Sequence, residues 1–148
     1  MINTEVKRKR LNIIAVLLVL CIILSGCSVY RNENLNGSQT KAVRYILHVG
    51  LNDKDTYKQK INDEKAMQIV TDITLKYTGG CTIYKCEGLY KDTKGKATKE
   101  NSLVIEIYGA DSKEIKNIMD ELLVSLNQES ILVEKGDVTY ELYSGKGD

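Results

Sequence analysis

Apolar and polar residues alternate with a period of two in several segments after residue 42, and this period is typical of half-buried β-strands. The strand-like segments are residues 43–51, 82–90, 102–108, 131–133 and 138–143. Polar or glycine-containing sequences separate them. These predict a turn at residues 52–55, a charged hairpin loop at 91–99 and a turn at 135–137.

Two other segments repeat apolar residues at helical spacing. The first spans residues 62–77, with Asn62 or Asp63 placed to cap its N-terminus. The second spans residues 111–126 and begins with Asp111-Ser112-Lys113-Glu114, the pattern of a capping box. Each helix has one apolar side and one charged side, so each is expected to cover a sheet from one direction.

The order strand, helix, strand, strand, helix, strand predicts an α+β fold of the ferredoxin-like βαββαβ type. Right-handed crossovers then place the strands at 43–51 and 102–108 in the centre of an antiparallel sheet, with both helices on one face. Because the chain contains no further element, the other sheet face is expected to stay uncovered.

The beginning of the chain has the layout of a bacterial export signal. Residues 7–10 are all basic, and an uncharged run at 13–24 follows that is shorter than the roughly 20 residues of a membrane span. It ends in Leu24-Ser25-Gly26-Cys27, which resembles the lipobox of bacterial lipoproteins. The resemblance implies cleavage between Gly26 and Cys27 and a diacylglycerol on the Cys27 thiol. The alternative is a signal-anchor helix with an incidental cysteine.

We therefore expect three parts: a signal peptide at residues 1–26, a lipid-anchored flexible tether at 27–41, and one domain at 42–148. Cleavage after Gly26 leaves 122 residues with 17 basic and 19 acidic side chains, a net charge of −2. Nucleic-acid binders carry a clustered basic excess, so this balance argues against a nucleic-acid partner. The expected location is the extracytoplasmic side of the cell membrane, held through the lipid.

Several short motifs occur in a fixed order along the expected domain. They are Val49-Gly50-Leu51, Gly80-Cys81-Thr82, residues 88–92, Asn101-Ser102-Leu103-Val104 and residues 127–132. Together they resemble family 3574 of the bacterial domains of unknown function, over about residues 45–143. The resemblance implies an exported α+β domain and supplies no catalytic residues. The chain differs from the family in having Tyr90 where an indole is usual.

Four residues are predicted to share the uncovered sheet face. Ile46 and His48 are out of phase with the apolar residues of the first strand, and Glu106 and Tyr108 are out of phase with those of the third. The patch is either an ordinary outer face with satisfied side chains or a surface for a ligand or partner.

Other candidate sites carry weaker signals. Cys81 and Cys86 are too far apart in an extended strand for a disulfide, and with one histidine they do not complete a metal site, so we expect buried thiols and neither metal nor cofactor. Asn52, Asp53 and Asp55 lack the glycine and closing glutamate of a calcium loop. Residues 128–130 are either the cap of the second helix or a recognition edge.

These observations favour a non-catalytic binding or interaction domain at the cell envelope, with an envelope protein or a small ligand as partner. The alternative is a small-molecule enzyme in which two copies join through their open sheet faces and enclose a pocket around His48, Glu106 and Tyr108. A structural envelope component without a discrete ligand is a third hypothesis.

Overall fold

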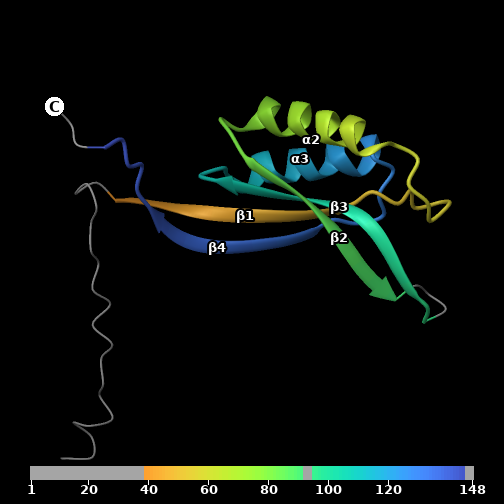
Figure 1. Ribbon diagram of the computed structural model, residues 1–148. Coiled ribbons are helices and arrows are strands. Elements are labelled where there is room, and N and C mark those ends of the chain that lie inside the picture. The colour runs from red at the N-terminus through yellow and green to blue at the C-terminus, as the bar shows by residue number, and fades with distance from the viewer. Residues whose placement is uncertain (1–38, 92–94, 146–148) are drawn as a thin grey trace, which may run out of the picture. The chain divides into compact units, whose positions relative to one another are not determined.

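A computed structural model describes residues 39–91 and 95–145, which form four strands and two helices in the predicted order (Figure 1). The elements are β1 (Thr40–Gly50), α2 (Asp63–Tyr77), β2 (Thr82–Lys91), β3 (Ala97–Tyr108), α3 (Ser112–Ser125) and β4 (Leu132–Tyr140). The predicted signal peptide, Cys27 and the tether up to residue 38 lie outside the described residues. Neither described helix is long and apolar enough to cross a bilayer.

The four strands form one antiparallel sheet in the order β2-β3-β1-β4. β1 and β3 are therefore the central strands, as predicted. Figure 1 shows α2 and α3 side by side on one face of this sheet. The ferredoxin-like α+β prediction is confirmed, and no element of the described residues covers the second face.

The hydrophobic core lies between the helices and the sheet. Alternate residues of β1 and β3 point into it, because successive side chains of a strand project to opposite faces. Its members are Tyr45, Leu47, Val49, Leu51, Ala66, Val70, Ile73, Leu103, Ile105, Ile107, Ile115, Ile118, Leu122 and Leu126. The predicted apolar faces of both central strands and both helices therefore meet in a single core.

Both helices begin at side-chain caps that the sequence predicts. The Asn62 side chain accepts a hydrogen bond from the Lys65 amide at 2.8 Å, so Asn62 is the cap of α2. At α3, Asp111 accepts from the Glu114 amide at 2.8 Å and the Glu114 carboxylate accepts from the Asp111 amide at 2.7 Å. The capping box is confirmed, and it satisfies amides that have no partner within the helix.

The end of the sheet differs from the prediction. Residues 135–137 were expected to turn between two short strands, but β4 is one strand that pairs with β1 from Leu132 to Tyr140. Gly136 lies opposite Arg44 within it and has no positive φ. The turn prediction was wrong because the long neighbouring strand supplies backbone partners for the whole segment, and this outweighs local turn propensity.

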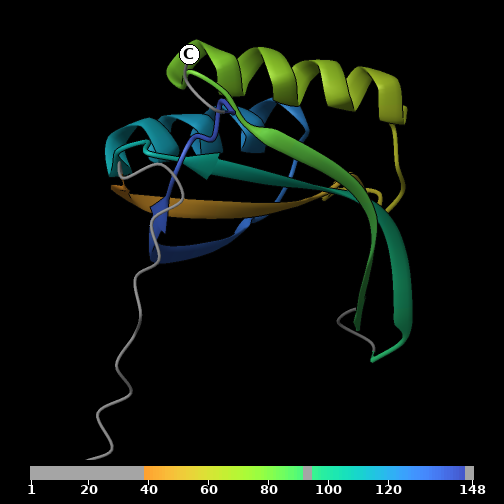
Figure 2. The same ribbon diagram turned by 60° about the vertical axis from the view of Figure 1, so that its left-hand side comes forward.

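β3 also begins earlier than expected, at Ala97 rather than at residue 102. The pairing of β2 with β3 extends from Thr82–Glu106 to Lys91–Ala97, whereas the pairing of β1 with β3 stops at Gly50–Ser102. The tip of the β2–β3 hairpin is consequently a two-stranded ribbon that extends beyond the end of β1. Figure 2 shows it bending away from the helix layer.

Truncation in the core should cost far more stability than truncation on the surface. Leu47 has no exposed surface, so Leu47→Ala should lower the free energy of unfolding by about 2–5 kcal/mol through lost burial and a residual cavity. Val124, on the outer side of α3, is 82% exposed, and Val124→Ala should change it by less than about 0.5 kcal/mol. Urea denaturation of both variants measures the difference, and similar losses would contradict the described core.

Candidate functional site

The open sheet face contains all four residues that the sequence analysis selected. Within it, Ile46 of β1 lies directly opposite Glu106 of β3, and Tyr108 lies opposite Arg44. His48 is opposite Val104, one pair further along the same face. The two central strands thus bring Ile46, Glu106 and Tyr108 together, and their role in binding remains a prediction.

Glu106 is the centre of a hydrogen-bonded cluster on this face. Its carboxylate accepts bonds from the hydroxyls of Tyr108 at 2.8 Å and Tyr84 at 3.2 Å, and from Arg44 Nη1 at 3.4 Å. The Glu106 side chain is only 16% exposed, compared with 41% for Arg44. Three donors from three strands therefore hold one carboxylate in place. We call Arg44, Tyr84, Glu106 and Tyr108 the Glu106 cluster.

Sequence reasoning missed two members of this cluster. Tyr84 lies in β2 opposite Val104, and its hydroxyl reaches the neighbouring Glu106. The Glu106 carboxylate raises the pKa of Tyr84, because it accepts the phenol's hydrogen bond and repels the phenolate. The strand period could have placed Tyr84 and Arg44 on this face, but it could not show which strands are neighbours.

His48 belongs to a second polar contact. Its Nε2 lies 2.7 Å from Oε1 of Glu134 in β4, and the two side chains are 37% and 57% exposed. In the described structure its hydrogen-bond partner is therefore Glu134, not Glu106. The mistaken turn prediction hid this partner, because a bent chain would not have placed Glu134 opposite Ile46. The edge of the face is completed by an edge-to-face contact of Tyr108 with Tyr140, with centroids 5.7 Å apart.

The described cysteines differ from the expectation of buried thiols. Both are free; Cys86 is exposed and Cys81 is half-buried, where burial raises the pKa of its thiol. Cys86 projects to the open face, and its Sγ lies 3.5 Å from the carbonyl oxygen of Ser102. The prediction failed because β2 is an edge strand with little cover. No group of three or more potential metal ligands gathers among the described residues.

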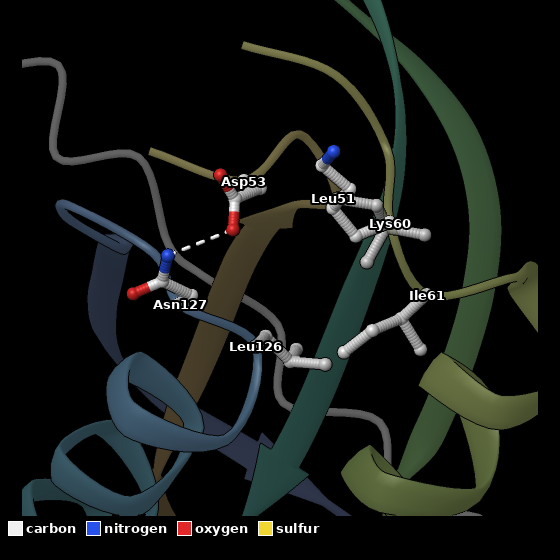
Figure 3. A pocket seen from close by; sticks show the side chains of 6 residues that line it. All are labelled: Leu51, Asp53, Lys60, Ile61, Leu126 and Asn127. Atoms are coloured by element: carbon white, nitrogen blue, oxygen red, sulfur yellow. Dashed lines mark hydrogen bonds between the residues drawn. The ribbon is translucent and has the colours of Figure 1, made fainter. Parts of the chain in front are cut away.

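A small hollow lies at the end of the domain where β1 leads into the 52–57 turn (Figure 3). Its volume is about 40 Å³, enough for water and far below that of a typical ligand pocket. Figure 3 shows Leu51, Ile61 and Leu126 on its apolar side and the bond from Asn127 to Asp53 on its polar side. We assign this hollow a structural role.

The polar side of the hollow joins α3 to the 52–57 turn. Asn127 Nδ2 donates to Asp53 at 2.8 Å, and this bond, with those from Thr56, lowers the pKa of Asp53. Gln128, only 8% exposed, donates to the carbonyls of Leu126 and Asn52, both at 3.0 Å. Of the two interpretations of residues 128–130, the structure favours the helix cap for Gln128.

Comparison with known protein families gives one match. Residues 44–141 match the family described as "Protein of unknown function (DUF3574)". The chain belongs to this family. The match covers β1 from Arg44 onwards and all of α2, β2, β3, α3 and β4, and it includes every member of the Glu106 cluster. No curated protein matches the sequence.

Solved structures share the fold of this DUF3574 member. A phage SAM lyase in complex with S-methyl-5′-thioadenosine is 21% identical, with a TM-score of 0.50 over 76% of this chain and 98% of the lyase. CutA from Synechococcus elongatus PCC7942 is 12% identical, with a TM-score of 0.47 over 70% of this chain and 86% of CutA. At these identities the likeness concerns the fold alone.

The Glu106 cluster can be tested by titration. Glu106→Gln removes the charge that disfavours the Tyr84 phenolate, so the pKa of Tyr84 should fall towards its ordinary value of about 10. Because the folded pKa is raised, the stabilisation that this contact gives is complete below about pH 10 and disappears as the pH rises through the folded pKa.

Ring-labelled tyrosine NMR, assigned through Tyr84→Phe, measures this shift. Glu134→Gln is the matched control, since it also neutralises a glutamate of the open face but one that contacts His48. It should leave the Tyr84 titration unchanged. Equal shifts in the two variants would show that the effect is not local to the cluster.

Proposed function

We propose that this protein is a lipid-anchored binding domain of the bacterial cell envelope and that the open sheet face is its binding surface. The observation that supports this most is the Glu106 cluster, in which a carboxylate is held by three side-chain donors on a face without cover. Polar groups that are fixed before a ligand arrives reduce the entropy cost of binding.

The chemistry of the cluster suggests the kind of ligand. A group that donates hydrogen bonds, such as an ammonium, amide or hydroxyl, can replace a tyrosine or Arg44 as a donor to Glu106. An apolar or aromatic portion of the same ligand can pack on the rings of Tyr84 and Tyr108, which are 50% and 44% exposed. Exposed aromatic residues beside a polar centre are common in recognition surfaces.

The proposed location depends on Cys27 as the acylated residue. Two acyl chains suffice for stable attachment, since each buried methylene contributes about 0.8 kcal/mol. β1 begins at Thr40, which pairs with Tyr140, so an anchor at Cys27 would join the domain at the end where β4 finishes. The hairpin ribbon, beyond the other end of β1, would then be the part furthest along the sheet from the anchored end.

A second candidate is a small-molecule enzyme formed when two copies cover each other's open faces. The observation that favours it is a carboxylate bonded to two phenols, a group that can exchange protons with a bound molecule once water is excluded. His48 would enter such a site only after leaving Glu134. The likeness to the phage lyase concerns the fold and adds no argument for lyase chemistry.

The anchor is tested by acylation. In cells fed radiolabelled palmitate, the wild-type protein should carry label and sediment with membranes, whereas Cys27→Ser should lose both properties. Cys21→Ser is the matched control, because Cys21 lies within the proposed signal peptide, and it should be labelled as the wild type. An unlabelled wild-type protein, or membrane-bound Cys27→Ser, would contradict the lipoprotein proposal.

The binding face is tested by photo-crosslinking in intact cells. A benzophenone amino acid at position 108 should form a discrete adduct, while the same group at Leu75, which is 51% exposed on α2, should not. Mass spectrometry of the adduct identifies an envelope protein, a small molecule or a second copy. A second copy would favour the enzyme alternative, and adducts no more frequent at 108 than at 75 would refute a binding role for this face.

A further inference from the structure

The sheet has two free edges, and neither is shortened or interrupted by a proline. β2 and β4 are the outer strands, with ten and nine residues, and each has one side without a backbone partner among the described strands. Natural proteins commonly shorten such edges, interrupt them with proline or bulges, or place charged residues on them, and of these devices β2 and β4 have only the charged residues. This chain contains no proline at all. Its edges are therefore available for pairing with another strand.

The two edges have compatible directions. β2 is antiparallel to β3, β3 to β1 and β1 to β4, so β2 and β4 run in opposite directions. If a second copy lies beside the first in the same orientation, its β4 meets β2 of the first copy as an antiparallel neighbour. The sheet then continues across the boundary with all helices on one face.

The faces of the two strands limit the possible registers. In β2, Tyr84 projects to the open face and Lys85 to the helix side. In β4, Glu134 contacts His48 on the open face, while Lys135 lies on the helix side, over the ring of Tyr45. A continuous sheet must pair even-numbered residues of β2 with even-numbered residues of β4, because otherwise the apolar faces would be reversed.

One register of this kind matches the side chains along nine residue pairs. It runs from Thr82 opposite Tyr140 to Tyr90 opposite Leu132. Within it Lys85 faces Asp137, and Glu87 faces Lys135. Neither Lys85 nor Asp137 has an ion-pair partner within the described residues.

The same register pairs exposed apolar residues. Leu89, which is 69% exposed, faces Val133, which is 42% exposed. Leu132, 63% exposed, faces Tyr90. Neighbouring registers are unfavourable, because a shift of two residues places Lys85 opposite Lys135 in one direction and Glu87 opposite Asp137 in the other. Like charges directly opposite each other destabilise a strand pair.

We propose that a second copy of this chain pairs its β4 with β2 in this register, which joins the two sheets. Each copy carries both edges, so the contact is head-to-tail and continues into a closed ring or an open filament. It leaves the open faces side by side and does not depend on what binds there. The pairing of β4 with β2 can therefore be correct whether or not the proposed function is.

A disulfide across the predicted pair Cys86–Gly136 tests the register. Opposed Cα atoms in an antiparallel pair are about 4.5–5.5 Å apart, within the range of a disulfide. Cys86 is exposed, and a Cβ on Gly136 would meet no atom within 4 Å. Under mild oxidation of whole lysates from cells that make the full-length Gly136→Cys protein, we expect a reducible ladder of dimers, trimers and larger products.

Two controls make this test specific. Adding Cys86→Ser to Gly136→Cys should abolish the ladder. Val124→Cys places an accessible thiol on α3, where residue 124 is 82% exposed, and should give only background cross-linking. A Gly136→Cys protein that cross-links no more than Val124→Cys, or that stops at dimers, would overturn the head-to-tail contact.

Charge exchange tests the same contact without cysteines. Lys85→Asp, and separately Asp137→Lys, should each weaken self-association by about fivefold, since like charges then face each other. The double variant exchanges the two charges and should restore the wild-type association. Sedimentation of the detergent-solubilised full chain measures the effect. A monomeric wild type, or a double variant weaker than both single variants, would overturn the proposal.

Discussion

The burial of one sheet face beneath two amphipathic helices is the constraint on which the rest of this structure depends. Leu47, Ile105 and Ile118 have no exposed surface, and burial of such a side chain stabilises the fold by about 1.5–3 kcal/mol. The ion pairs are partly or largely exposed, and contacts of this kind contribute about 0–1 kcal/mol each. The apolar layer therefore determines the fold, and the charged residues are available for other tasks.

Because a strand sends alternate side chains to opposite faces, fixing the buried face also fixes the open one. On that face the polar groups satisfy one another: Glu106 takes donors from β1, β2 and β3, and His48 of β1 meets Glu134 of β4. The Glu106 cluster needs three strands in register, and the His48–Glu134 contact needs β1 and β4, which are far apart in the chain. They are therefore properties of the assembled sheet, and neither exists in any hairpin alone.

Two contrasting features meet at the end of the sheet where β1 finishes. There, Asn127 and Gln128 join the last turn of α3 to the 52–57 turn through side-chain hydrogen bonds. At the same end, the β2–β3 ribbon extends past the last residue of β1, where no helix covers it. A ribbon of two strands is marginally stable in water. Pairing along β2 would extend the sheet beside it.

The sequence by itself determined the elements that rest on local signals. The helical period, the Asn62 cap and the Asp111–Glu114 capping box all lie within a few residues of one another, and so the helices and their apolar faces could be predicted. The period of two likewise placed Ile46, His48, Glu106 and Tyr108 on one face.

Only the tertiary structure decided which strands are neighbours. It kept residues 135–137 extended against β1, gave His48 its partner Glu134, and brought Tyr84 to Glu106 from an edge strand. It also left Cys86 exposed, since edge strands receive little cover. These outcomes depend on pairing between segments far apart in the chain, and a periodicity within one segment contains no information about its partner.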